Sequence, residues 1–92
     1  MHVTVEYAAQ IKRAAGVPGD EFEFENPTTL AELVKKIADL RGDALQGTLF
    51  TNEGELHLSI LVFVGDLQVR DAENHSLSDG DVVTFLSPIS GG

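Results

Sequence analysis

Residues 82–92 read VVTFLSPISGG, and the rest of the chain can be understood as the body that holds this segment. Residues 82–86 are rich in β-branched and aromatic side chains, which predicts a strand. Residues 87–92 then leave the strand as a tail that ends in Gly91 and Gly92. Glycine has no Cβ and accepts either sign of φ, so this pair fits a channel that is too narrow for other dipeptides. The tail therefore predicts delivery of a free α-carboxylate into the active site of another protein.

The glycine pair also has a plainer interpretation. Chain ends are commonly disordered and rich in small residues, and an expression remnant can end in the same way. The two glycines alone do not separate a functional tail from a frayed terminus. Their meaning depends on the body of the chain.

Length and composition predict one globular domain. The chain has 92 residues, of which 42% are hydrophobic and 23% are charged, and this leaves room for one core and no second domain. No apolar run approaches the roughly 20 residues that span a bilayer, and the first residues lack the pattern of a secretory signal. We therefore expect a single domain over residues 1–92, with 87–92 as a flexible tail, in the cytoplasm and without a membrane partner.

Charge and cysteine content narrow the possible partners. Fifteen acidic residues against six basic ones give a formal net charge of −9, which disfavours nucleic acid and favours a basic protein surface. An acidic coat that only keeps the chain soluble explains any single charge equally well. The chain has no cysteine, so it has no disulfide, thiolate metal site or cysteine nucleophile of its own. Any sulfur that the protein handles must come from outside.

The N-terminal third shows the alternation of two strands. Apolar and polar residues alternate in segments 2–7 and 20–25, which places one face of each segment toward a core. Between them, residues 8–16 leave the alternation and end at Gly16, which indicates turn chemistry. These patterns predict a hairpin with a wide connection.

Residues 29–41 carry the clearest local signal, that of an amphipathic helix. Thr29 and Glu32 have the spacing of a capping box. Gly42 follows the segment as a C-terminal stop. The apolar stripe has the spacing i, i+3, i+4, i+7 and i+10, and consists of Leu30, Leu33, Val34, Ile37 and Leu40.

The second half of the chain is predicted from shorter patterns. Residues 42–57 contain apolar side chains that suggest a short second helix over the core. Residues 58–64 form an apolar run without strict alternation, which predicts a strand covered for much of its length. Residues 67–70 are expected to pair back after a turn, and residues 71–76 to form a polar loop.

This element order predicts an α+β fold, with a mixed sheet of four to five strands and one main helix packed across it. If the first and last strands are central neighbours, the right-handed crossover preference makes them parallel. The tail would then project from the end of the sheet.

Familiar catalytic motifs are absent from the sequence, including phosphate-binding loops, nucleophile elbows and zinc-protease helices. His2, His57 and His75 lie far apart and show no metal-ligand spacing, so we expect them to be surface or strand-end residues. The acidic residues of 71–81 could bind a hard cation but lack the spacing of a calcium loop, and a solvated loop is the simpler interpretation. We therefore predict no metal site.

Three stretches together resemble one known family. Residues 7–16 (YAAQIKRAAG) are similar to its first loop, residues 29–33 (TLAEL) to the start of its helix, and residues 77–92 (LSDGDVVTFLSPISGG) to its ending. The family is that of the MoaD/ThiS-type ubiquitin-like sulfur carriers. The resemblance covers nearly the whole chain, and it implies a β-grasp fold and a functional glycine pair. It also implies a carrier or cosubstrate and no enzyme, and the chain could be the non-catalytic small subunit of a molybdopterin synthase.

The resemblance also implies a chemistry for the tail. An α-carboxylate, with a pKa near 3.3 to 3.7, is a poor acyl donor and must be activated. A ubiquitin-activating-like enzyme would adenylate Gly92, using ATP and magnesium that it binds itself, and a sulfur donor would displace AMP to leave a thiocarboxylate. A sulfur-accepting synthase, such as the large subunit of molybdopterin synthase, would then receive the tail. Gly92 would be the reacting residue, with Ser90 and Gly91 threading the channel and no cofactor bound to the carrier.

Leu86 and Leu67 are candidates for an apolar docking face. Alternation places Phe85 and Leu86 on opposite sides of the last strand, which leaves Leu86 available to a partner. Partial burial of Leu86 in the core is an equally weighted alternative.

Two further functions fit the same residues. The chain could be a protein modifier joined through Gly92 to target lysines, or an interaction module with an inert tail. Conjugates that depend on Gly92 would identify a modifier. A mass gain of about 16 Da on the free protein would identify a carrier. Full function after deletion of both glycines would identify an interaction module. The sequence leaves the pathway open among molybdopterin, thiamine and cysteine synthesis and tRNA thiolation.

Overall fold

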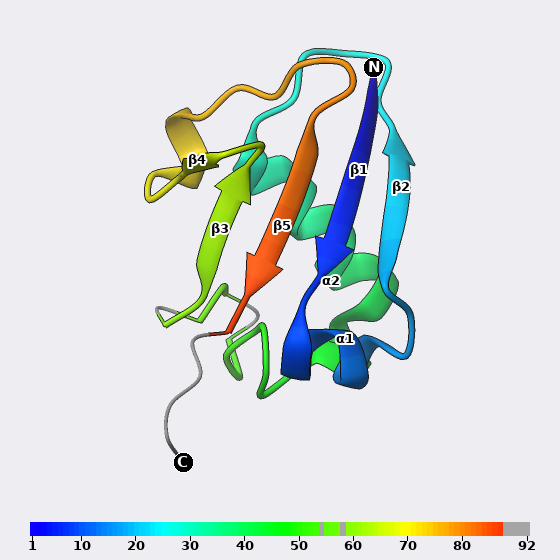
Figure 1. Ribbon diagram of the computed structural model, residues 1–92, viewed down its shortest axis with the longest axis vertical. Helices are drawn as coiled ribbons and strands as arrows, with labels where there is room; N and C mark the ends of the chain where they lie inside the picture. Colours follow the sequence, from blue (N-terminus) through cyan, green and yellow to red (C-terminus); the bar gives the residue numbers. More distant parts are fainter. Residues whose placement is uncertain (54, 58, 88–92) are drawn as a thin grey trace.

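The computed structural model describes residues 1–53, 55–57 and 59–87 of the chain. Five strands, two helices and one 3₁₀ turn lie within these ranges (Figure 1). In chain order they are β1 (His2–Tyr7), α1 (Ala9–Ala15), β2 (Gly19–Glu23), α2 (Leu30–Leu45), β3 (Leu61–Val64), β4 (Leu67–Gln68), η1 (Ala72–Asn74) and β5 (Val82–Leu86).

The five strands form one mixed sheet in the order β2-β1-β5-β3-β4. The central strands β1 and β5 are parallel, with Thr4 opposite Val82 and Tyr7 opposite Phe85. The other three pairings are antiparallel. The prediction of a mixed sheet with parallel first and last strands is therefore confirmed, and β5 has the predicted bounds.

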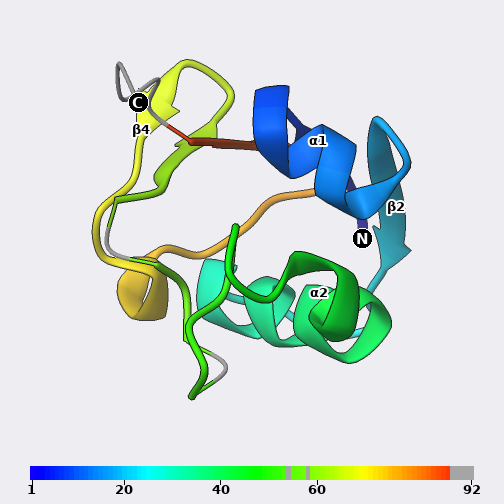
Figure 2. The same ribbon diagram turned by 90° about the horizontal axis from the view of Figure 1, so that it is seen from below.

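Helix α2 crosses one face of the sheet and closes the core (Figures 1 and 2). Its buried stripe contains Leu30, Leu33 and Ile37. The sheet contributes side chains that alternation directs to the same side, among them Val5 and Phe85, which are fully buried. Burying a side chain of this size is worth about 1.5 to 3 kcal/mol, so this layer contact is the main source of stability.

The start of α2 agrees with the predicted capping box only in part. Thr29 is the N-cap, and its hydroxyl oxygen accepts a hydrogen bond from the Glu32 N–H at 3.3 Å. The Thr29 hydroxyl also lies 3.4 Å from the Glu32 carboxylate, to which it donates. This contact takes the place of the second hydrogen bond of a capping box, in which the Glu32 carboxylate would accept from the Thr29 N–H.

The predicted end of the main helix at Gly42 is wrong. The helix runs to Leu45, with a kink at Arg41, whose φ of −132° and ψ of 19° are not helical. Leu40, which lies just before the kink and was predicted on the apolar stripe, is 57% exposed, whereas Leu45 beyond the kink is fully buried. Helical spacing failed here because it assumes one straight axis.

Residues 46–57 contribute to the core without forming a helix of their own in the part that the structure describes. Leu49 and Phe50 are buried, and Phe50 forms isolated bridges with Gln46 and Leu56. The predicted second helix corresponds to the last turn of α2. None of the helices within the described ranges is both long and apolar enough to cross a membrane.

Residues 8–16, predicted as turn structure, contain the short helix α1. Ile11 and Ala15 are its buried residues, and the helix ends at Gly16 in the left-handed conformation, with φ of 78°. The Gly16 N–H donates to the Lys12 carbonyl oxygen at 3.0 Å. The end at Gly16 was predicted correctly, but one buried pair is too little periodicity to reveal a helix of seven residues.

Candidate functional site

The site predicted from the sequence begins where β5 ends. Because β5 runs parallel to β1, the C-terminal ends of both strands lie at the same end of the sheet, next to α1 (Figure 1). The Ala8 N–H donates to the Phe85 carbonyl oxygen at 3.1 Å, so the start of α1 is attached to the end of β5. The predicted reactive residues Ser90, Gly91 and Gly92 lie outside the described residues, and their roles stay predictions.

The strand that precedes the tail is firmly held. Val83 and Phe85 are fully buried on the helix side of the sheet. The ring of Phe85 packs against that of Tyr7 on the neighbouring strand, with centroids 6.5 Å apart. The tail therefore begins from a central strand that is hydrogen-bonded on both sides.

The two predicted docking residues lie on opposite faces of the sheet. Leu86 is opposite Leu61, is half-buried, and points away from α2. Leu67 is opposite Val64, on the face that carries α2, and is 60% exposed at the edge of the sheet. The structure therefore does not bring them into one surface, and the docking role stays a prediction for each residue separately.

Leu86 instead belongs to an apolar half of the outer face, which we define as the sheet face away from α2. Leu61 lies directly opposite Leu86 on this face, and Phe63 lies opposite Thr84, the next outward residue of β5. Val82 is on the same face, on the other side of Thr84. Val82 is 37% exposed, and the others are half-buried. Sequence reasoning missed Leu61 and Phe63, because residues 61–64 are apolar on both faces and alternation gave no sign of the outer one.

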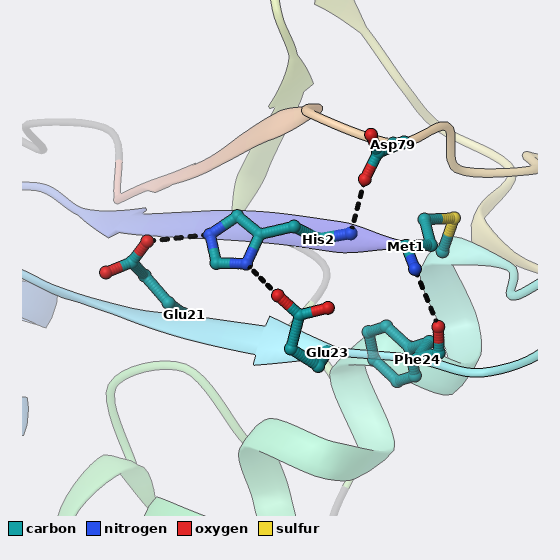
Figure 3. Close-up of polar contacts among 6 residues, drawn as sticks. All are labelled: Met1, His2, Glu21, Glu23, Phe24 and Asp79. Atoms are coloured by element: carbon teal, nitrogen blue, oxygen red, sulfur yellow. Dashed lines mark hydrogen bonds and ion pairs between the residues drawn. The ribbon is translucent and has the colours of Figure 1, made fainter.

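The other half of the outer face, on β1 and β2, is acidic. It carries Glu6, Glu21 and Glu23, all exposed, together with His2. The His2 ring lies between two carboxylates, with Nε2 2.7 Å from Glu21 and Nδ1 2.5 Å from Glu23 (Figure 3). Hydrogen bonds to Glu23 and Glu21 raise the pKa of His2, because both ring nitrogens donate only in the protonated form.

A second polar cluster lies on the helix side, at the end of the sheet where β1 and β5 finish. The Tyr7 hydroxyl donates to Asp20 Oδ2 at 2.7 Å, and Arg41 donates through Nε and Nη2 to the two Asp20 oxygens at 2.5 and 2.6 Å. Arg41 lowers the pKa of Asp20, and burial raises the pKa of Tyr7. The cluster ties β1, β2 and the kink of α2 together.

The described residues offer no metal site. No group of three or more His, Asp or Glu side chains among them could hold a metal ion. His57 and His75 are half-buried in separate segments, and the His2 nitrogens are already directed at carboxylates. The absence of a metal centre from the histidines and the acidic loop stays a prediction from the sequence.

Comparisons with known proteins match the chain over its full length. The family model of the ThiS family matches residues 5–92. Among solved structures, small archaeal modifier protein 1 (SAMP1) from Haloferax volcanii is 20% identical, with a TM-score of 0.85 and 100% of both chains covered.

Two further similar structures are protein complexes. One holds subunits 1 and 2 of the molybdopterin-converting factor from Helicobacter pylori, and its matching chain is 24% identical, with a TM-score of 0.67 and 100% of both chains covered. The other is the BexX/CysO complex of Amycolatopsis orientalis, at 25% identity, with a TM-score of 0.68, 98% of this chain and 99% of that chain covered. The sheet order, the helix across it and the family match through the glycine pair identify the chain as a member of the ThiS family, ubiquitin-like sulfur carriers of β-grasp fold.

Proposed function

We propose that this protein is a sulfur carrier that works through a thiocarboxylate on Gly92, and that it is not itself an enzyme. The observation that carries the proposal is the ThiS family match, which runs to residue 92 and so includes Gly91 and Gly92. The cytoplasmic location and the lack of a bound cofactor remain predictions from the sequence.

The proposed reaction has two steps, both catalysed by partners. A carboxylate oxygen of Gly92 attacks the α-phosphorus of ATP in a ubiquitin-activating-like enzyme, which forms the acyl adenylate and releases pyrophosphate. Hydrosulfide that the sulfur donor supplies then attacks the Gly92 carbonyl carbon, the bond to AMP breaks, and AMP and one proton leave the thiocarboxylate. The activating enzyme supplies the magnesium and the cationic groups that stabilise charge on the phosphates.

The outer face is the proposed docking surface for these partners. Its apolar half adjoins the strand that leads into the tail, and its acidic half lies beside it, which suits a partner surface with an apolar centre and basic neighbours. Two similar structures are complexes with another protein, which supports a synthase as the kind of partner. The acceptor is expected in molybdopterin, thiamine or cysteine synthesis or in tRNA thiolation.

Adenylation of the tail can be tested by ATP–pyrophosphate exchange with a cognate activating enzyme. We expect exchange with the natural chain and at least a tenfold loss for Gly91→Leu, because a bulky side chain would block the channel. Gly42→Leu is the control for a general effect of a new leucine, because φ at Gly42 is not positive and nothing lies within 4 Å of an added Cβ there. Undiminished exchange with Gly91→Leu would contradict the threading role.

The docking surface can be tested with two matched substitutions. Phe63→Asp places a charge in the apolar half of the outer face, whereas Leu67→Asp places one on the other face of the sheet. We expect KM for the carrier to rise about tenfold in the first variant, equivalent to about 1.4 kcal/mol, and to be little changed in the second. Equal effects would show that the outer face is not the docking surface.

A second candidate function is that of a protein modifier, with Gly92 joined to lysines of target proteins. It is favoured by the likeness to small archaeal modifier protein 1, which has a TM-score of 0.85. Tagged chain expressed in its host would give a ladder of conjugates that disappears when Gly92 is deleted. A thiocarboxylate on the free protein without such a ladder would favour the carrier alone.

A further inference from the structure

Strand β2 forms one edge of the sheet and has β1 as its only neighbour among the described strands (Figure 1). The opposite edge is less open, because the two-residue strand β4 covers part of β3. Strand β2 is five residues long and contains no proline that would prevent pairing. Its outer edge therefore offers a regular row of main-chain groups to another strand.

The register shows which groups these are. The Met1 ammonium donates to the Phe24 carbonyl oxygen at 2.8 Å (Figure 3), and the Phe24 N–H donates to the Met1 carbonyl oxygen at 2.9 Å. Further along the pair, the Tyr7 N–H donates to the Pro18 carbonyl oxygen. In an antiparallel pair the bonded residues alternate, so Phe24, Phe22 and Asp20 direct their main-chain groups toward β1. Glu21 and Glu23, which lie between them, direct their N–H and C=O groups away from the sheet.

The two sides of this edge have different chemistry. On the outer face, the carboxylates of Glu21 and Glu23 have side chains that are 68% and 73% exposed. On the helix side, the rings of Phe22 and Phe24 stack with centroids 6.3 Å apart and are half-buried. A strand paired with this edge would place alternate side chains beside the carboxylates and beside the rings.

Charge determines which strand would fit. His2 offsets one of the two carboxylates when it is protonated, and Glu25 adds a further exposed negative charge just beyond β2. A second copy of this chain would bring like charges face to face, which is unfavourable in a cross-strand pair. Basic side chains opposite Glu21 and Glu23, with apolar ones between them against the phenylalanine rings, satisfy both faces.

We propose that the outer edge of β2 is a strand-addition site for an extended segment of a partner protein in which basic and apolar residues alternate. Main-chain hydrogen bonds to Glu21 and Glu23 supply the affinity, and the two faces supply the specificity. The site is independent of the chemistry at the C-terminus. It lies at the far edge from β3 and leaves the apolar half of the outer face free for a different partner.

The site can be tested by NMR titration of the ¹⁵N-labelled full chain with a synthetic peptide of alternating lysine and valine. We expect the largest shifts at the Glu21 and Glu23 amides, with saturation below about 1 mM peptide. A peptide of the same sequence, N-methylated on the edge that would face β2, should bind at least tenfold more weakly, because it keeps its charge but loses the main-chain bonds.

A charge swap completes the test. Glu21→Lys combined with Glu23→Lys should reduce binding of the lysine–valine peptide at least tenfold and create binding of a glutamate–valine peptide. Amides away from β2 and from His2, which contacts both glutamates, should keep their shifts. Binding that is insensitive to N-methylation or to the swap would overturn the proposal. So would shifts of the Glu21 and Glu23 amides with protein concentration alone, which would identify a second copy as the occupant.

Discussion

Strands β1 and β2 are joined by two polar clusters of similar chemistry in different surroundings. The His2 cluster (His2, Glu21 and Glu23) lies on the outer face at the start of β1, and the Tyr7 cluster (Tyr7, Asp20 and Arg41) lies on the helix side at its end. Each pairs a cation with carboxylate oxygen. The glutamate side chains are 68% and 73% exposed, whereas Asp20 and Arg41 are 12% and 23% exposed.

The comparison shows that solvent exposure, more than hydrogen-bond geometry, determines how much such a cluster contributes to stability. Water screens an exposed ion pair, whose contribution to stability is small, and its carboxylates remain free to exchange partners. A sheltered carboxylate that loses its partners keeps the cost of its desolvation. We therefore assign the Tyr7 cluster to stability and the His2 cluster to recognition at the β2 edge.

Among the substitutions that test this comparison, Gly19→Ala should cause the largest loss of stability, because it disturbs the pairing of β1 and β2, which carry both clusters. A Cβ at Gly19 would collide with the main chain of Val5, which neither strand can avoid without moving. We expect a loss of about 2 to 3 kcal/mol in the free energy of unfolding, measured with urea.

Gly42→Ala is the matched control for this substitution. Nothing lies within 4 Å of a Cβ at this position, which is inside α2. The change should be neutral or stabilising by up to about 1 kcal/mol, because alanine favours helix. A similar loss in both variants would contradict the assigned contact with Val5.

Asp20→Asn should come next in size. It removes the charge that Arg41 faces in a sheltered position and weakens two hydrogen bonds to the guanidinium. We expect a loss of about 2 kcal/mol in the free energy of unfolding. Glu21→Gln, the equivalent change in the His2 cluster, should leave the free energy of unfolding unchanged within experimental error. Equal losses in the two variants would contradict the role assigned to solvent exposure.

The two clusters should also differ in the direction of their pH dependence. The pKa of Asp20 is lowered from 3.8 in the folded protein, so its contribution is complete above that value and is lost as the pH falls through the folded pKa. The pKa of His2 is raised from 6.5, so its contribution is complete below 6.5 and is lost as the pH rises through the folded pKa.

The pH dependence of the Tyr7 cluster can be checked by measuring the free energy of unfolding of the natural chain and of Asp20→Asn across pH. The stability difference between the two should shrink only in acid. His2→Gln checks the pH dependence of the His2 cluster. We expect the smallest change in stability here, because the ring is exposed to solvent. A large loss for His2→Gln that persists at high pH would contradict the charge-based account of this cluster.

The sequence was sufficient for features that repeat over many residues or that pair locally. Alternation and helical spacing predicted β1, β5 and the body of α2, and the crossover rule predicted that β1 and β5 are parallel. It was insufficient where tertiary contacts decide. Arg41, at the kink of α2, pairs with Asp20, 21 residues away, and no local pattern contains that pair.

The candidate site was predictable to a similar degree. The glycine pair and the end of β5 could be found because the signal is contiguous in the sequence. The joint docking face of Leu86 and Leu67 could not be judged, because the face on which each side chain lies depends on register across β3. Phe63 and Leu61 were missed for the same reason, since both faces of β3 are apolar.

The central claim is that the Gly92 carboxylate becomes a thiocarboxylate. The most direct measurement is the intact mass of the natural chain after incubation with a cognate activating enzyme, ATP, magnesium and a sulfur donor. The account predicts a species about 16 Da heavier, from replacement of one oxygen by sulfur, that is absent when ATP is omitted or Gly92 is deleted. An unchanged mass in a reaction that still consumes ATP in a Gly92-dependent way would contradict it.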